Sequence, residues 1–311
     1  MTIDPIVITG ASGLIGSALV ELLGREPNDG EPIELRGTSR DPEALRRSMP
    51  QLSASARWPL TSPAILRGAH AVVHLAGENV GNAPWTTERK RAIEASRIEG
   101  TRSLVQQLGK LEPSERPKVL VSMSAIGFYG ETGERVVDES APRGEGFLAE
   151  LCERWENEAK EAVAHGLRVV TPRMGLVMSP KSGALGAQLP LYKLGLGGKL
   201  GSGQQYWPII HLRDACELIR LSIDDERIEG PLNATAPYPV RQSEFAKTLG
   251  SVLHRPAFLP APAFALKLAL GDFSQELLES RNVVPAKALA MGFRFRFERL
   301  RPMLEDLLDR R

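Results

Sequence analysis

Cysteine is scarce in this chain of 311 residues, which has only Cys152 and Cys216, far apart and outside any CxxC pair. The sequence therefore excludes a disulfide framework and a thiolate metal site. It also lacks a run of about 18 apolar residues, the length that a membrane-spanning helix needs. Its first residues, MTIDPIVITG, have neither the charged nor the apolar region of a signal peptide. We therefore expect a cytoplasmic protein with no membrane partner.

An excess of charge of either sign is absent as well. The chain has 39 Lys and Arg against 38 Asp and Glu, a net charge of +1, and no long block of like charge. A nucleic-acid-binding protein needs a basic patch, so we expect no nucleic-acid partner. Apolar residues make up 42% of the chain. This composition predicts a folded protein of one large domain or two modest ones, and it leaves the oligomeric state open.

Short apolar, β-branched runs alternate with longer segments of helical period over the first 180 residues or so. This alternation is typical of successive βα units, and it predicts an α/β fold with a Rossmann-type, doubly wound parallel sheet. Helices are expected over about residues 14–23, 93–108 and 148–163, where apolar residues recur every three or four positions. The expected strands are residues 6–8, 33–35, 71–76, 118–123, 167–171 and 231–235.

A glycine-rich loop follows the first expected strand. Residues 9–16 read TGASGLIG, with glycines at positions 10, 13 and 16, and they lead directly into a helix. In a dinucleotide-binding loop the first glycine permits a tight turn, the second lets the backbone approach a diphosphate, and the third lets the helix pack on the strand. An ordinary βα turn with incidental glycines is the alternative. The register favours a diphosphate site formed by Gly10, Ser12, Gly13, Leu14, Ile15 and Gly16.

The end of the second expected strand indicates which dinucleotide binds. An acidic residue there would grip a ribose 2′-hydroxyl, whereas an arginine would accommodate a 2′-phosphate. The sequence has Ser39 and Arg40, and the following Asp41 and Pro42 look like the N-cap and first residue of a helix. We therefore predict NADP(H) as the cofactor, with Arg40 at the phosphate and Ser39 assisting. A solvated surface arginine is the alternative for Arg40.

The composition and the apolar pattern of the sequence change after Pro180. Glycines crowd residues 195–203, which we interpret as a loop, and proline-spaced helices follow from Pro237. Residues 293–297 alternate Phe with Arg and predict a short strand. We expect an NADP-binding Rossmann domain of residues 1–180 plus about 205–235. A smaller, mostly helical substrate or lid domain would comprise about residues 181–204 plus 236–311, with Trp85, Phe128, Tyr192 and Trp207 as lid aromatics or buried loop anchors.

Several motifs carry a family resemblance. They are HLAGENV (residues 74–80), SAIGFYG (124–130), FLAELCERWE (147–156), GGKLGSGQ (197–204), NATAPYP (233–239) and RPAFLPAP (255–262). Together with the glycine loop they resemble the extended short-chain dehydrogenase/reductase superfamily. More narrowly, the whole chain is similar to atypical epimerase-family proteins that have a C-terminal domain of unknown function.

The resemblance implies positions for the cofactor. Leu60 and the strand end Leu75-Ala76-Gly77 would line the adenosine and ribose, with Glu78 beside them. Ser122 would lie near the nicotinamide ribose, and residues 173–177 would run beneath the nicotinamide ring.

The catalytic pair of the superfamily is missing. Short-chain enzymes use a tyrosine whose pKa is lowered by a lysine four residues later. None of the four tyrosines in this chain is followed by such a lysine, and the resemblance puts Leu148 and Cys152 at the two positions. It likewise puts Arg97 at a helix position that is asparagine in the superfamily. Ser124 and Tyr129 are then the candidate catalytic residues, against the alternatives of a turn cap and a packed aromatic.

Further acid or base candidates are Glu78 and Lys193, while a metal site is not expected. His70 and His74 are four residues apart, but they lie at the start of an expected strand and have no third ligand. Asp214, close to His211, is expected to cap a helix.

Two functions follow from these residues. The first is an NADP(H)-dependent oxidoreductase or epimerase that acts on a small polar substrate without the Tyr-x-x-x-Lys pair. The second is a non-catalytic NADP(H)-binding or redox-sensing protein.

Overall fold

The computed structural model describes residues 5–25, 33–81 and 83–309, and its centre is a parallel sheet. All pairings described in this sheet are parallel, and β6 (Ser124–Ala125) pairs alongside β7. The run from β3 through β1 to β5 and β7 has the strand order of a doubly wound dinucleotide-binding sheet, which confirms the expected fold class. The spatial order is β11 (Gly230–Ala234), β7 (Arg168–Met174), β5 (Val119–Ser122), β4 (Ala71–His74), β1 (Ile6–Thr9), β2 (Leu35–Ser39) and β3 (Leu52–Arg57).

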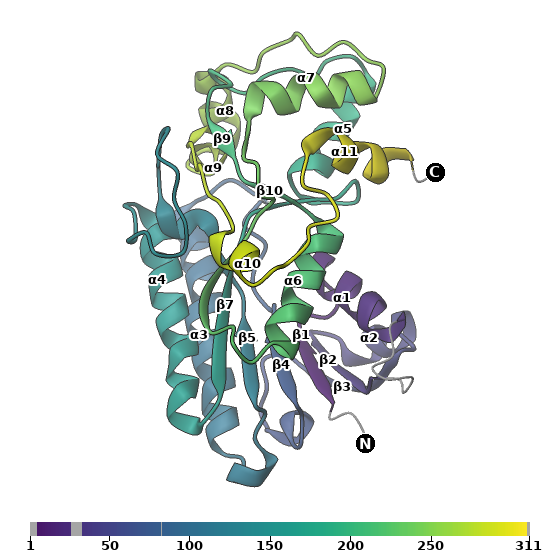
Figure 1. Ribbon diagram of the computed structural model, residues 1–311, viewed down its shortest axis with the longest axis vertical. Helices are drawn as coiled ribbons and strands as arrows, with labels where there is room; N and C mark the ends of the chain where they lie inside the picture. Colours follow the sequence, from purple (N-terminus) through teal and green to yellow (C-terminus); the bar gives the residue numbers. More distant parts are fainter. Residues whose placement is uncertain (1–4, 26–32, 82, 310–311) are drawn as a thin grey trace.

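Helices cover both faces of the sheet (Figure 1). On one face α3 packs against α4, and on the other α1 packs against α6. The strand residues alternate to match, since Ile6 and Ile8 belong to one apolar cluster and Val7 to another. The helices of this part are α1 (Leu14–Arg25), α2 (Pro42–Ser48), α3 (Thr87–Gly109), α4 (Phe147–Lys160) and α6 (Leu212–Asp224).

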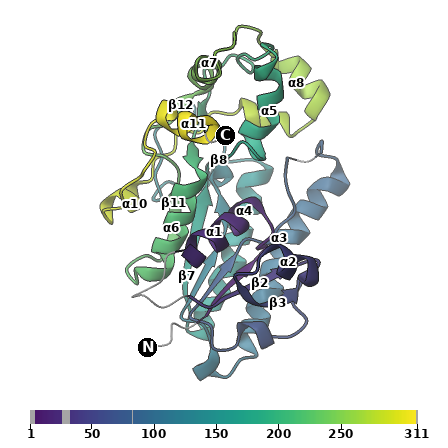
Figure 2. The same cartoon turned by 90° about the vertical axis from the view of Figure 1, so that its right-hand side faces the viewer.

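A second group of elements lies beyond the carboxyl ends of the strands (Figures 1 and 2). Two small pairs of strands connect it to the sheet: β8 (Leu176–Met178) with β10 (Ile209–His211), and β9 (Tyr206–Trp207) with β12 (Val240–Arg241). The helices here are α5 (Gly183–Lys193), α7 (Gln242–Val252), α8 (Ala263–Leu270), α9 (Ser274–Leu278) and α11 (Leu300–Asp309).

The C-terminal segment returns to the sheet before the chain ends. Val283 forms a parallel bridge with Val137, and the amide of Asn282 donates to Thr132 Oγ1 at 2.9 Å. Helix α10 (Ala286–Ala290) contacts β11. Ala288 and Phe295 are buried in the same apolar cluster as strands β1, β4 and β5. Residues 282–295 therefore contribute to the core of the central sheet.

The expected strand over residues 293–297 is wrong. Phe295 and Phe297 are buried in alternation with exposed arginines, but the segment pairs with no strand in the described part of the chain. The amides of Arg296 and Phe297 donate to the two carboxylate oxygens of Asp214 at 2.9 and 3.0 Å. A buried side chain thus supplies the acceptors that a neighbouring strand would have supplied.

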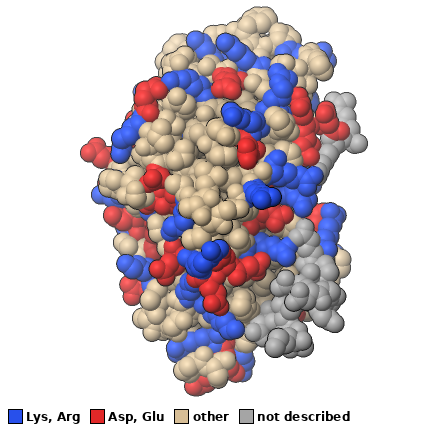
Figure 3. Space-filling model, in the orientation of Figure 1, with Lys and Arg blue, Asp and Glu red and all other residues tan. Residues whose placement is uncertain are grey.

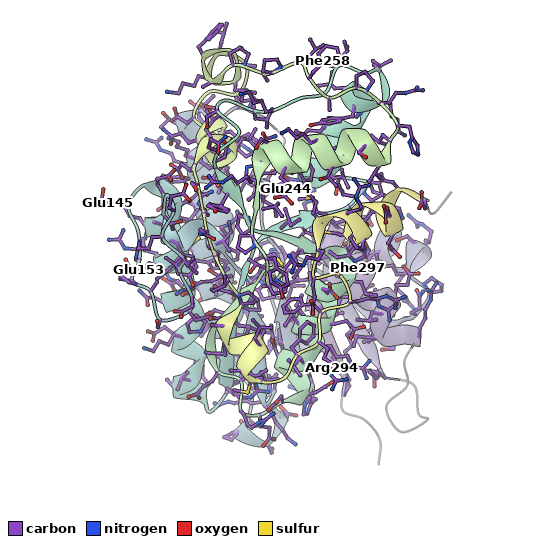
Figure 4. All side chains as sticks on the ribbon, turned by 45° about the horizontal axis from the view of Figure 1, so that its top comes forward. Glu145, Glu153, Glu244, Phe258, Arg294 and Phe297 are labelled. Atoms are coloured by element: carbon purple, nitrogen blue, oxygen red, sulfur yellow. The ribbon has the colours of Figure 1, made fainter. Side chains whose placement is uncertain are left out.

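Asp214 is accordingly not the helix cap that the sequence predicted. The N-cap of α6 is His211, whose Nδ1 accepts from the amide of Arg213 at 3.0 Å. The imidazole of His211 also stacks on the ring of Phe297, labelled in Figure 4, with centroids 4.0 Å apart.

Strand bounds differ from the expected ones at several places, most of all in the second strand. The second strand is residues 35–39 rather than 33–35, and Ile33 is buried ahead of it. The sheet also has an edge strand, β3, that the sequence pattern did not predict.

The distribution of charged side chains and the character of the helices are consistent with the near-zero net charge and the lack of long apolar runs in the sequence. Lys and Arg are interspersed with Asp and Glu over the face seen in Figure 3. Among the described residues, no helix combines the length and the apolar character that crossing a bilayer requires.

Candidate functional site

The glycine loop joins β1 to α1 at the carboxyl edge of the sheet. Gly10 has φ of +67°, and a Cβ there would lie 2.9 Å from the amide nitrogen of Ala76. A Cβ on Gly16 would lie 2.4 Å from the carbonyl oxygen of Gly10, so this glycine is required by the packing of the helix on the loop. The space around Gly13 is less restricted, because a Cβ there would lie 3.2 Å from the same oxygen. The loop therefore has the backbone form that a diphosphate site needs.

The outer side of this loop is open. Ser12 and Gly13 are exposed, and Leu14 and Ile15 are half-buried at the start of α1. The first amides of a helix have no partner within it, and they carry the positive end of its dipole. This combination suits an anion.

A buried histidine ties the neighbouring strand to the loop. His74 Nδ1 lies 2.7 Å from Thr9 Oγ1, and its Nε2 lies 3.1 Å from Thr101 Oγ1. The same Thr9 oxygen accepts from the amides of Leu75 and Ala76 at 3.2 Å. Burial lowers the pKa of His74 to about 3, so the ring is neutral.

His74 is thus a core histidine whose two ring nitrogens each lie within hydrogen-bond distance of a threonine hydroxyl. No group of His, Cys, Asp or Glu that could hold a metal ion occurs among the residues that the structure describes.

The end of β2 has the predicted local structure. Asp41 Oδ1 accepts from the amide of Ala44 at 2.9 Å, so Asp41 is the N-cap of α2 and Pro42 its first residue. The hydroxyl of Ser39 is turned to the backbone of Asp41, 2.6 Å from its carbonyl oxygen. Arg40 is exposed, and within the described ranges it makes neither an ion pair nor a side-chain hydrogen bond. Its guanidinium is therefore available to a ligand.

Leu60 and Ser122 are both buried. Leu60 packs in the apolar cluster under α3. Ser122, at the end of β5, is fully buried, and its hydroxyl finds no hydrogen-bond partner within the described residues. A buried hydroxyl without a partner is uncommon in proteins, so this one has unused capacity for a bound group.

Ser124 and Tyr129, the candidate catalytic residues, belong to one buried network. The Ser124 hydroxyl donates to Glu156 Oε1 at 2.6 Å. Arg173 donates to both carboxylate oxygens of Glu156 at 2.8 Å and to the phenol oxygen of Tyr129 at 2.9 Å. The Tyr129 hydroxyl in turn donates to Asn233 Oδ1 at 2.7 Å.

The surroundings of Tyr129 make it a poor acid. Its side chain is 1% exposed, and burial raises its pKa to about 12 despite the opposing effect of Arg173. The Arg173 guanidinium also lies over the ring of Phe128, 3.4 Å from its centroid. The network holds β6, β7, α4 and β11 together, and a proton-transfer role for either hydroxyl stays a prediction.

A cavity of about 180 Å³ opens beside this network. Leu148 and Cys152 line it, so the two positions that the resemblance assigned to the missing catalytic pair do face a cavity. Burial raises the pKa of Cys152 to about 12, which keeps its thiol neutral. The other lining residues are Val80, Arg97, Ala125, Ile126, Gly127, Leu151, Trp155, Met174, Gly175, Leu176, Tyr206, Trp207, Pro208, Glu276, Glu279 and Arg281.

The far wall of the cavity was not predicted. Arg281 donates to both oxygens of Glu276 at 3.0 Å and pairs with Glu279 as well. Its amide donates to the carbonyl of Tyr206 at 3.1 Å. No motif marks these residues in the sequence, because they reach the cavity through contacts between distant segments.

The remaining candidates, with the exception of Trp207, lie outside this cavity lining. Glu78 Oε1 accepts from Arg89 at 2.8 Å. Lys193 is exposed at the end of α5. The four aromatics Trp85, Phe128, Tyr192 and Trp207 are all buried, and of these Trp207 lines the cavity.

Comparison with known proteins agrees with this geometry. A model of the NAD-dependent epimerase/dehydratase family matches residues 6–234, and a domain of unknown function matches residues 261–307. Epimerase family protein SDR39U1 homolog, chloroplastic, of Arabidopsis thaliana is 36% identical over 305 residues, which cover 97% of this chain and 86% of the relative. Epimerase family protein YfhF of Bacillus subtilis is 35% identical, with 97% of each chain covered.

A solved structure is similar over the same extent. The human epimerase family protein SDR39U1 (isoform 2), solved with NADPH, is 29% identical and has a TM-score of 0.85, covering 98% of this chain and 99% of the human one. These matches confirm the resemblance that the motifs indicated. The chain belongs to the NAD-dependent epimerase/dehydratase family.

Proposed function

We propose that the protein binds NADP(H) at the carboxyl edge of the sheet and acts as an oxidoreductase or epimerase on a small polar substrate. The observation that carries the proposal is the loop of Gly10, Gly13 and Gly16, which leaves the first amides of α1 open where a diphosphate would lie. The adenosine side would be held by Leu60, Leu75, Ala76, Gly77 and Glu78.

The choice of NADP(H) rests on the end of β2. Arg40 is exposed beside the N-cap of α2, and its guanidinium has no carboxylate partner in the described part of the chain. A guanidinium in this place suits a 2′-phosphate. The human relative solved with NADPH supports the same choice.

The nicotinamide would supply or take a hydride, and the chain would position it. Ser122 has a buried hydroxyl with no described partner, which suits the nicotinamide ribose. Leu148 and Cys152 line the cavity, and the resemblance aligns them with the superfamily's tyrosine and lysine, so neither position would supply a phenol or an ammonium. A substrate proton would pass through water, Ser124 or Tyr129, which predicts slow turnover.

Cofactor titration tests the proposal. Arg40→Ala should weaken NADPH binding by about 10- to 100-fold, the worth of a charge-assisted hydrogen bond, and should leave NADH binding unchanged. Arg46→Ala is the matched control, because Arg46 is an exposed arginine on the adjoining helix. Equal affinity of the intact protein for NADPH and NADH would refute the assignment of Arg40.

Gly13→Ala tests the diphosphate site with little cost to folding. The added methyl meets the Gly10 carbonyl at 3.2 Å, a contact that a small shift relieves, but it stands on the open side of the loop. We expect a loss of NADPH affinity of at least tenfold with a nearly unchanged melting temperature. Undiminished NADPH binding by this variant would place the cofactor elsewhere.

The absence of the catalytic pair favours a second function, a non-catalytic NADP(H)-binding or redox-sensing protein. The two are separated by incubating NADPH-loaded protein with a panel of carbonyl compounds and sugar nucleotides. Tight cofactor binding with neither oxidation nor isomer exchange would establish the second function.

A further inference from the structure

One cation at the cavity, Arg97, makes no ion pair with any residue that the structure describes. Arg97 projects from α3, and its Cζ lies 5.0 Å from the centroid of the Trp155 ring. On its other side it lies against backbone, since a Cβ built on Gly77 would be 3.7 Å from the same Cζ. The guanidinium is therefore held between a strand end and an aromatic ring, at the wall of the cavity.

The hydrogen bonds of Arg97 use one edge of the guanidinium. Nη1 donates to the carbonyl oxygens of Glu78 and Ile93 at 3.1 and 3.3 Å, and to Ser96 Oγ at 3.4 Å. Among the described residues, neither Nε nor Nη2 of Arg97 donates a hydrogen bond. These two N–H groups point in the same direction in an arginine, and they form the edge that binds a carboxylate through two parallel hydrogen bonds.

The charges around Arg97 compensate it only in part. The Glu78 carboxylate is ion-paired with Arg89 at 2.8 Å, and although its charge also acts on Arg97, no ion pair joins Glu78 to Arg97 among the described residues. Cys152, which also faces Arg97, remains a neutral thiol because burial raises its pKa. Across the cavity, Arg281 has two carboxylate partners, whereas Arg97 has none among the residues described. Removing a guanidinium from water without an ion-paired carboxylate is costly, so a bound anion would stabilise Arg97 in this place.

We infer that Arg97 binds the carboxylate of a small anionic substrate through Nε and Nη2. The inference rests on the proposed function and narrows its substrate class. The cavity of about 180 Å³ is smaller than the roughly 300–1,000 Å³ typical of sites for drug-sized ligands, so it suits a short carboxylic acid with an adjacent hydroxyl or carbonyl group rather than a sugar nucleotide.

Thermal melting with matched pairs of probes tests this assignment. Acetate, lactate and pyruvate are compared with the neutral acetamide and lactamide, at constant ionic strength, with and without saturating NADPH. The intact protein should be stabilised more by the carboxylates than by the amides. Arg97→Met should lose this response by at least tenfold in apparent affinity, and Arg97→Lys should retain a weaker one because it keeps the charge without the planar edge. Arg91→Met, which removes an exposed cation from the same helix, should respond like the intact protein.

The outcomes separate this inference from the proposed function. If Arg97→Met responds to carboxylates like the intact protein, or if the amides stabilise equally, the inference is wrong. If Arg97→Met instead loses NADPH affinity by tenfold or more and carboxylates have no effect on the intact protein, the guanidinium serves the cofactor diphosphate and the substrate assignment fails. If the intact protein binds no NADPH, the proposed function fails, and the carboxylate response without cofactor still decides the role of Arg97.

Discussion

The buried pair of Glu156 and Arg173 gives the sharpest test of the structure. Their side chains are 13% and 4% exposed, and Arg173 makes two of its charged hydrogen bonds to this one carboxylate. Glu156→Gln keeps the shape of the side chain but removes the charge. Arg173 then stays buried without a counter-ion, which costs about 3–5 kcal/mol.

The effect should be visible as a lower melting temperature. An unfolding entropy of roughly 2.1 cal/mol/K per residue gives about 1.5 °C per kcal/mol for a chain of 311 residues, so we expect a fall of about 5–8 °C. Ser124→Ala is a milder control, because it removes one hydrogen bond to Glu156, worth about 1.5–3 kcal/mol, and leaves the ion pair in place.

A double-mutant cycle checks the reasoning. Arg173→Met alone leaves the Glu156 carboxylate buried without a counter-ion. The double variant with Glu156→Gln leaves no unpaired buried charge. The double variant should therefore be destabilised by clearly less than the sum of the two single variants, with a coupling of about 2 kcal/mol or more. Chemical unfolding of the four proteins measures this coupling. Additive effects would refute the view that the pair is held by mutual neutralisation.

Three further predictions concern folding. The pKa of His74 is about 3 in the folded protein and about 6.5 in the unfolded chain. Between these two pH values the unfolded chain binds a proton that the folded protein does not bind. The free energy of unfolding therefore falls by up to about 1.4 kcal/mol per pH unit as the pH is lowered through that window. His74→Gln should flatten this part of the stability profile measured by urea unfolding, and an unchanged profile would contradict the buried neutral ring. Asp41→Ala should cost about 1 kcal/mol through loss of the N-cap, while Asp41→Ser should restore most of it. Gly16→Ala should lower stability by about 1–3 kcal/mol, more than Gly13→Ala, because its methyl would lie 2.4 Å from a backbone oxygen; equal losses at the two glycines would argue against the described loop.

The nucleotide-binding half of the fold was predictable because its sequence pattern is local. Gly10 and Gly16 are each required by a backbone contact within a few residues or with the adjoining strand, so their spacing reveals the loop. The helix cap at Asp41 is local as well. The missed strand, Leu52–Arg57, is an edge strand in which Leu52 alone is buried, so its residues give no apolar alternation.

Long-range contacts explain the other errors. The alternating burial of Phe295 and Phe297 was recognised, but the acceptors for their segment come from Asp214, far away in the sequence. The cavity wall formed by Glu276 and Arg281 likewise depends on packing that no short motif encodes. The unused Nε and Nη2 groups of Arg97 can be recognised only from the three-dimensional arrangement of its neighbours.

The return of the C-terminal segment to the sheet makes the nucleotide-binding half depend on residues near the end of the chain. Residues 280–297 donate backbone hydrogen bonds to the early part of the chain and place Ala288 and Phe295 in its interior. A polypeptide cut after residue 234, where the epimerase/dehydratase match ends, would leave that interior open to water. Replacing this tail by an unrelated segment should therefore destabilise the nucleotide-binding half, because both contribute side chains to one apolar cluster.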